Sequence, residues 1–140
     1  MQTLLRTLRT LRTLATQGSR QRPYDLKIQR VASNTSTGRQ TILTPSNGFR
    51  TRLIRVTVHQ DTADDRHLWE LYFGTAGNII TDQKKGIDIL AVPDKGKAST
   101  RTFLRGQGPR GDRDEPLSGR WRGTAPVVAH EIIIEYTEEP

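Results

Sequence analysis

Hydrophobic and polar residues alternate in short runs along most of this chain, and turn-forming residues separate the runs. Such a period of two is typical of β-strands that bury one face. In the third run we expect Ile54, Val56 and Val58 to point inward while the residues between them face solvent. In the first run, Leu26 and Ile28 point to a common side. The predicted strands cover residues 25–31, 39–44, 50–60, 66–73, 87–92, 100–105, 116–122 and 127–137.

Eight runs with regularly spaced turn signals predict an all-β fold, an antiparallel eight-stranded β-sandwich of jelly-roll type. A smaller Greek-key barrel is the alternative. Gly18, Ser19 and Pro23 precede the first run and mark a hinge in the chain. We therefore expect an N-terminal arm, residues 1–22, followed by one β-sandwich domain, residues 23–140.

The arm begins with the sequence MQTLLRTLRTLRTLA, a near-repeat of Leu-Arg-Thr. Wound as an α-helix, it places leucines on one side and arginines on the other, although its period of three and its threonines weaken the helix. We expect this basic amphipathic arm to lie in a groove of a neighbouring subunit, with its leucines buried and its arginines paired to acidic side chains. The candidate contact residues are Leu4, Arg6, Leu8, Arg9, Leu11 and Arg12.

Two other interpretations of the arm remain open. A mitochondrial presequence is also amphipathic and rich in arginine and hydroxyl residues, and the first acidic residue here is Asp25. A helix that binds a membrane surface or RNA has the same composition. Cleavage between Gly18 and Arg22 in cells would identify a presequence.

The charge is distributed unevenly along the chain. The net charge is +7 and the isoelectric point is about 10.4, values that favour an anionic partner. Residues 1–22 hold five arginines and no acid, whereas the remaining residues hold 17 basic and 15 acidic side chains. An anionic partner would therefore meet the arm first, and the nearly balanced body argues against a domain that is basic throughout.

The composition limits the chemistry that this chain can carry. With 33% hydrophobic residues and a mean hydropathy of -0.65, the core is modest, and no apolar run approaches the roughly 18 residues of a membrane span. There are no cysteines and three histidines, so neither a disulfide framework nor a thiolate metal site can form. No arrangement of nucleophile, base and acid emerges. We expect no enzyme activity, no cofactor, no metal and no membrane partner.

Two apparent motifs do not change this interpretation. Gly106, Gly108 and Gly111 spell G-x-G-x-x-G, but no strand–helix context surrounds them, so we expect a flexible loop. His59 and His67 flank a predicted hairpin tip, where we expect both to face solvent and to bind no metal.

A secondary basic surface is the remaining candidate site. The Arg-Trp-Arg triplet around Trp121 could stack a nucleotide base between arginines, although we expect this tryptophan to cover the edge of the sandwich instead. The basic residues that could form this surface are Arg50, Arg52, Arg55, Arg120 and Arg122.

From about residue 41 to residue 139 the chain resembles small β-sandwich proteins of tailed-phage virions. The segments that carry the resemblance are TPSNGFRTRLIRVTV, LWELYFG and GDRDEPLSGRWRGTAPVVAHEIIIEYTEE. The resemblance implies the jelly-roll body of a decoration, fibre-base or spike protein. The resemblance identifies no functional residue in this chain. The Leu-Arg-Thr arm is not part of the pattern that these proteins share.

These observations lead to one main expectation and its alternatives. We expect a virion structural protein at the capsid surface, a decoration (cement or auxiliary) protein that binds the major capsid protein or other virion subunits. We also expect the body to associate with its own copies as a homo-oligomer, a trimer or a dimer. The alternatives are a protein of the head–tail junction or fibre base and a basic module that binds nucleic acid.

Overall fold

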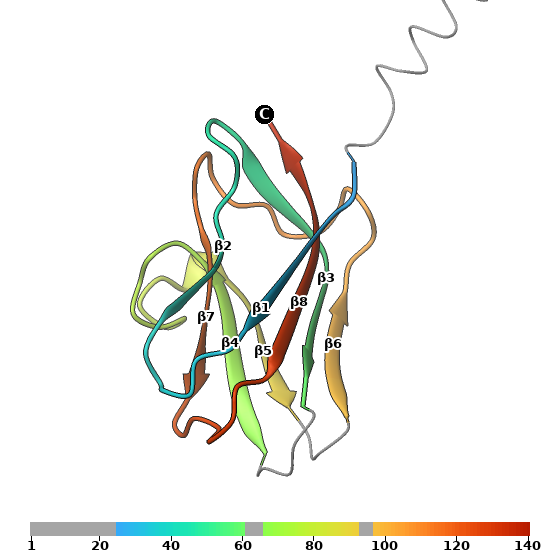
Figure 1. Cartoon of the computed structure of the whole chain (residues 1–140). Helices are drawn as coiled ribbons and strands as arrows, with labels where there is room; N and C mark the ends of the chain where they lie inside the picture. The colour runs from blue at the N-terminus through green and yellow to red at the C-terminus, as the bar shows by residue number, and fades with distance from the viewer. Residues whose placement is uncertain (1–24, 61–65, 93–96) are drawn as a thin grey trace, which may run out of the picture.

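The computed structural model describes residues 25–60, 66–92 and 97–140, and these residues form eight strands and one short 3-10 helix (Figure 1). The predicted contact residues of the arm lie outside the described residues. Each predicted strand overlaps one strand of the structure. The elements are β1 (Lys27–Ala32), β2 (Gln40–Leu43), β3 (Arg50–His59), β4 (His67–Phe73), η1 (Gln83–Lys85), β5 (Gly86–Val92), β6 (Ala98–Thr102), β7 (Leu117–Arg122) and β8 (Glu131–Glu139).

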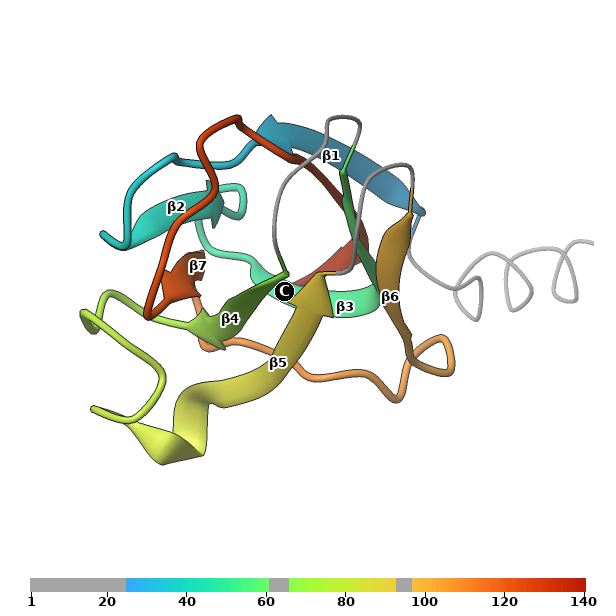
Figure 2. The same cartoon turned by 90° about the horizontal axis from the view of Figure 1, so that it is seen from below.

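The strands form two antiparallel four-stranded sheets that face each other across the core (Figure 2). Their orders are β1-β8-β3-β6 and β2-β7-β4-β5. The pairs β1–β8, β2–β7, β3–β6 and β4–β5 are those of a long hairpin that is rolled up once, which is the jelly-roll arrangement. The expectation of an eight-stranded β-sandwich is confirmed. No helix of the described residues is long and apolar enough to span a membrane.

Every second side chain of the central strands points into the core between the two sheets. Trp69 of β4 lies directly opposite Trp121 of β7, and both indoles are buried. Gly119 makes room for them, since a Cβ atom at this position would lie 2.1 Å from Cζ2 of Trp69. From the other sheet, Ile132 and Ile134 of β8 complete this hydrophobic core.

A β-bulge in β3 changes which side chains point into the core, compared with the alternation that the sequence predicted. The β3–β8 register shifts between Leu53 and Arg55, so that Leu53 is fully buried and Ile54 is only half-buried. Val56 and Val58 point inward as expected. The prediction for Ile54 is therefore wrong, because the extra residue at the bulge reverses the alternation on one side of it.

The glycine-rich loop between β6 and β7 is bound along β3. The amide of Leu53 donates to the carbonyl of Pro109 at 3.0 Å, and the amide of Gly111 donates to the carbonyl of Thr51 at 2.9 Å. Gly108 is buried in this contact, and a Cβ atom there would lie 2.0 Å from the Leu53 carbonyl oxygen. Backbone hydrogen bonds thus hold part of this loop against β3, whereas the sequence predicted a flexible loop.

Candidate functional site

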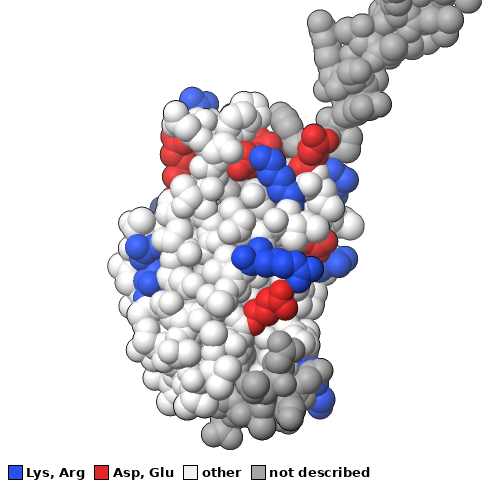
Figure 3. All heavy atoms as spheres, in the orientation of Figure 1, with Lys and Arg blue, Asp and Glu red and all other residues white. Residues whose placement is uncertain are grey.

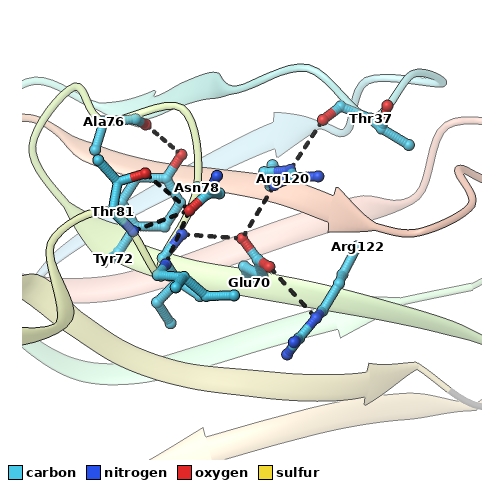
Figure 4. Close-up of polar contacts among 10 residues, drawn as sticks. Thr37, Glu70, Tyr72, Ala76, Asn78, Thr81, Arg120 and Arg122 are labelled. Carbon is cyan, nitrogen blue, oxygen red and sulfur yellow. Dashed lines mark hydrogen bonds and ion pairs between the residues drawn. The ribbon is translucent and has the colours of Figure 1, made fainter.

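The outer face of the β2-β7-β4-β5 sheet carries an unusual buried carboxylate. Trp69 and Leu71 of β4 point into the core, so Glu70 and Tyr72 must point to the outside of the sheet. Glu70 is nevertheless only 1% exposed, and Tyr72 is buried as well. Residues 74–85, which we call the covering loop, connect β4 to β5 and shield these two side chains (Figure 4).

Hydrogen bonds fasten the covering loop to the sheet. The amide of Ile79 donates to Oε2 of Glu70 at 3.1 Å, and the hydroxyl of Tyr72 donates to the carbonyl of Ala76 at 2.7 Å. Within the loop, Oδ1 of Asn78 accepts hydrogen bonds from the amides of Ile80 and Thr81 and from the hydroxyl of Thr81. The loop therefore has a defined shape that depends partly on the Glu70 carboxylate.

Two arginines of β7 share this carboxylate. Arg120 lies directly opposite Glu70 in the β4–β7 register. Nη1 of Arg120 lies 3.8 Å from Oε2 of Glu70, and Nε of Arg122 lies 3.8 Å from Oε1. These distances exceed a hydrogen bond, so the attraction is electrostatic and guanidinium donors remain for other acceptors. Nε of Arg120 donates to the carbonyl of Thr37 at 3.0 Å, as Figure 4 shows.

A third arginine lies on the same face. Nη1 of Arg39 donates to the hydroxyl of Thr41 at 3.0 Å and to the hydroxyl of Ser118 at 3.1 Å. Ser118 is on β7, two residues before Arg120 and on the same side of the sheet. We call Arg39, Arg120 and Arg122, with the single carboxylate of Glu70, the arginine face.

The phenol of Tyr72 lies near the arginines of this face, and burial has the largest effect on its pKa. Burial raises the pKa of Tyr72 above its usual value of 10, and this effect exceeds the opposite influence of Arg39 and Arg120. The hydroxyl therefore stays protonated and keeps its hydrogen bond to Ala76.

Exposed apolar side chains border the arginine face. Leu68 is 43% exposed and lies opposite Arg122 on one side and Ala91 on the other. Ile89, which is 37% exposed, lies opposite Glu70 on β5. The surface thus places cationic groups on β7 next to apolar groups on β4 and β5, a composition that protein interfaces favour.

The outer face of the other sheet has a different charge balance. Arg30 donates to Glu131 at 2.7 Å, and Nε of Arg55 lies 3.2 Å from Oε2 of Glu135. Toward the β6 edge of this sheet, the hydroxyls of Thr57 and Thr100 are 3.3 Å apart. In Figure 3, blue and red side chains lie beside one another over this part of the molecule. Arg30 and Arg55 thus each have their own carboxylate, whereas in the described part of β2, β4 and β7 and of the segment before β2, three arginines of the arginine face accompany one carboxylate.

The structure separates the five arginines of the expected secondary basic surface. Arg50, Arg52 and Arg55 are on β3, in one sheet, while Arg120 and Arg122 are on β7, in the other. The five therefore do not form one continuous patch. Arg52 is also engaged, because its guanidinium binds the carboxylate of Glu139 through two nitrogens and donates to the carbonyl of Gly108 at 2.9 Å.

Trp121 packs in the core between the sheets, on a strand with a neighbour on each side, and does not cover the edge of the sandwich as expected. Its indole is 1% exposed, and Nε1 donates to the carbonyl of Asn34 at 2.9 Å. The ring is therefore not accessible for stacking on a nucleotide base.

His67 does not face solvent, and that prediction is wrong. It lies opposite Val92 and on the inward side of β4, two residues before Trp69. Its ring meets Trp121 edge to face at 5.7 Å, and the buried His130 ring lies 5.2 Å from the same indole. Within the described residues, no group of three His, Cys, Asp or Glu side chains could hold a metal ion.

Glu70, Tyr72 and Arg39 are not among the site residues expected from the sequence. The run LWELYF did contain a usable signal, since a carboxylate in a strongly apolar strand needs a cationic or hydrogen-bonding partner. Arg39 gave no such signal, because its position on the face depends on the pairing of β2 with β7.

No protein-family model matches this chain, and neither a curated protein nor a solved structure matches it at a significant level. The arginine face is therefore interpreted from its own geometry.

Proposed function

We propose that this chain is a structural protein of a virion, a decoration protein that docks on the capsid shell. The arginine face is the docking surface of the body, and residues 1–22 add a second contact. The observation that carries the proposal is the positive charge on this face, where Arg120 and Arg122 share one buried carboxylate beside the exposed Leu68 and Arg39 binds Ser118 on the same strand as these arginines.

The chemistry of the face suits an acidic protein surface. Guanidinium groups that are already positioned by a carboxylate, a hydroxyl or a carbonyl lose little conformational entropy when they bind another carboxylate. The neighbouring Leu68 and Ile89 contribute apolar area that a protein partner can cover. The covering loop fixes the shape of the site before binding, because Ile79 and Ala76 are held by β4.

The jelly-roll fold is compatible with this role but does not select it. Jelly rolls occur in viral capsid proteins, in lectins and in cupins, so the fold alone carries no function. The arginine-rich sequence of residues 1–22 adds a second basic element, and two separate contacts increase avidity for a surface with repeated subunits.

Nucleic-acid binding is the second candidate, and the five arginines in residues 1–22 favour it. The body offers less support, because its two tryptophans are buried and Arg30 and Arg55 of the β1-β8-β3-β6 sheet are paired with glutamates. A nucleic-acid complex would weaken steeply as salt is raised, with roughly tenfold or greater losses across the physiological range.

Sedimentation of native particles tests the proposal. Source material is separated on a density gradient, and the chain is quantified by mass spectrometry in each fraction. A decoration protein travels with the particles at a fixed, high ratio to the major shell protein, whereas a junction or fibre-base protein travels at a low ratio. A chain that remains at the top of the gradient contradicts the proposal.

Two matched variants then test the docking surface. Arg122→Gln removes a half-exposed arginine from the arginine face, and Arg55→Gln removes a half-exposed arginine from the opposite sheet. We expect Arg122→Gln to weaken binding to undecorated shells about tenfold and Arg55→Gln to have little effect. Equal losses from both variants would assign the binding to overall charge and not to this face.

A further inference from the structure

The strand β1 forms an edge of its sheet, and within residues 25–60, 66–92 and 97–140 no strand pairs with its outer side. Among the residues that the structure describes, it pairs only with β8, and it is the outermost strand of the order β1-β8-β3-β6 (Figure 2). Unpaired backbone groups along such an edge are a template for another extended strand. The edge is also apolar, because Leu26 is 47% exposed and Ile28 is 55% exposed.

The hydrogen bond after β1 identifies which residues face this edge. The amide of Ser33 donates to the carbonyl of His130 at 2.8 Å, and this pair continues the β1–β8 register. In an antiparallel ladder, successive residues direct both backbone groups alternately toward the partner strand and away from it. Ile28, Arg30 and Ala32 therefore direct their amides and carbonyls to the open side. Of these groups, the carbonyl of Ala32 is already bound by Nε2 of Gln40 at 2.8 Å.

The other edge strands are covered or short. Nε of Arg101 on β6 lies 3.5 Å from Oδ2 of Asp88 on β5, so these two edges close one side of the sandwich. Oδ1 of Asp88 also accepts the amide of Ile89 at 2.8 Å, which occupies a backbone donor of β5. The edge strand β2 has four residues and an irregular register. Short, irregular or covered edges resist strand addition, whereas β1 has six regular residues.

The charges on β1 permit a second β1 strand to approach. Nζ of Lys27 donates to Glu138 at 3.0 Å, and Arg30 donates to Glu131 at 2.7 Å. Both carboxylates belong to β8, so each cation is compensated within its own subunit. Two copies of β1 can therefore lie side by side without the repulsion that uncompensated like charges cause.

We infer that β1 pairs antiparallel with β1 of a second copy, forming a two-fold dimer in which one sheet continues across both subunits. Ile28 lies opposite Ile28 of the second copy, and Leu26 lies opposite Arg30. This register uses the free backbone groups of Ile28 and Arg30, covers the two exposed apolar side chains, and leaves Ala32 outside the seam. A symmetric pair of identical surfaces closes after two subunits. The inference concerns the chain alone and does not depend on a capsid partner.

Proline substitution tests the edge without disturbing the β1–β8 ladder. Ile28→Pro removes an amide that faces the open side, a position where edge strands tolerate proline. Thr102→Pro is the matched control on β6. The amide of Phe103 donates to the carbonyl of Ile54 on β3 at 2.8 Å, so the amide of Thr102 points away from β3.

The full chain and both variants are compared by sedimentation velocity over a range of concentrations, with thermal unfolding as a check on the fold. We expect a dimer for the full chain and for Thr102→Pro. We expect Ile28→Pro to unfold cooperatively but to dimerise at least about tenfold more weakly, because two hydrogen bonds and the apolar contact are lost. A full chain that is monomeric at all concentrations, or a dimer that Ile28→Pro leaves unchanged, overturns the inference.

Disulfide trapping tests the register. The chain contains no cysteine, so Ile28→Cys introduces a single thiol. Hydrogen-bonded antiparallel pairs place Cα atoms about 5.5 Å apart, a separation that a disulfide spans. We expect rapid formation of a covalent dimer under mild oxidation for Ile28→Cys and slow formation for Thr102→Cys. Equal rates would overturn the proposed seam. Failure of shell binding in the presence of this dimer would instead count against the proposed function alone.

Discussion

Glu70 and Arg120 lie directly opposite each other on β4 and β7, with 3.8 Å between Oε2 of the carboxylate and Nη1 of the guanidinium. The carboxylate is 1% exposed, although it points to the outside of the sheet. It therefore serves two purposes, since it compensates two arginines and accepts the amide of Ile79 from the covering loop. A buried carboxylate of this kind is costly to remove, because the groups around it lose their partner.

Glu70→Gln should therefore lower the free energy of unfolding by about 2 kcal/mol, a value reduced from that of fully buried pairs because Arg122 is partly exposed. Urea unfolding measures this change. Hydrogen exchange should show faster exchange at the Ile79 amide, whose acceptor is weakened. Asp82→Asn, at an exposed carboxylate in the same loop, is the control. An unchanged midpoint for Glu70→Gln would mean that the carboxylate does not hold the loop.

Gly108→Ala should destabilise the protein by about 3 kcal/mol. The added Cβ atom would lie 2.0 Å from the carbonyl oxygen of Leu53, a backbone atom that cannot move independently of β3. Gly77→Ala is the matched control, since no atom lies within 4 Å of the position of its Cβ atom, and we expect a change within about 0.5 kcal/mol. Denaturant unfolding of both variants tests the prediction, and equal stabilities would show that the loop does not depend on this contact.

Stability should fall in acid because the side-chain carboxylate of Glu139, the last residue of β8, becomes protonated. Hydrogen bonds from Arg52 hold the pKa of Glu139 below its usual value of 4.5, and they outweigh the opposite effect of burial. Because the pKa is lower in the folded state, the stabilisation is fully present above pH 4.5 and is lost as pH falls through the folded pKa.

Unfolding midpoints measured from about pH 7 to about pH 3 should show this loss. In Glu139→Gln the decline should be shallower, with lower stability at neutral pH. If the variant and the natural sequence lose stability in parallel, another group is responsible for the acid sensitivity.

The fluorescence of Trp69 and Trp121 should report a dry environment. Both side chains are 1% exposed, so the emission should be blue-shifted and poorly quenched by acrylamide. Addition of an oligonucleotide should leave the emission unchanged even if residues 1–22 bind it, because neither indole can stack on a base. Strong quenching by the oligonucleotide would contradict the buried position of Trp121.

The positions of the strands could be predicted from sequence, because the alternation of hydrophobic and polar residues follows the local pleat of the backbone. Val56 and Val58 point inward for this reason, as expected. The direction of the Ile54 side chain could not be predicted, because the bulge arises from the pairing of β3 with β8. The burial of His67 likewise depends on which side of β4 meets the opposite sheet.

The candidate site shows the same division. Local sequence determined that β7 presents Arg120 and Arg122 on one side of the strand and Trp121 on the other. Only the tertiary structure decided that both arginines lie near Glu70, that Arg39 lies on the same face, and that β1 is an edge strand of the described sheet. The physical reason is that strand formation follows from neighbouring residues, whereas the environment of a charge or an edge depends on segments far apart along the chain.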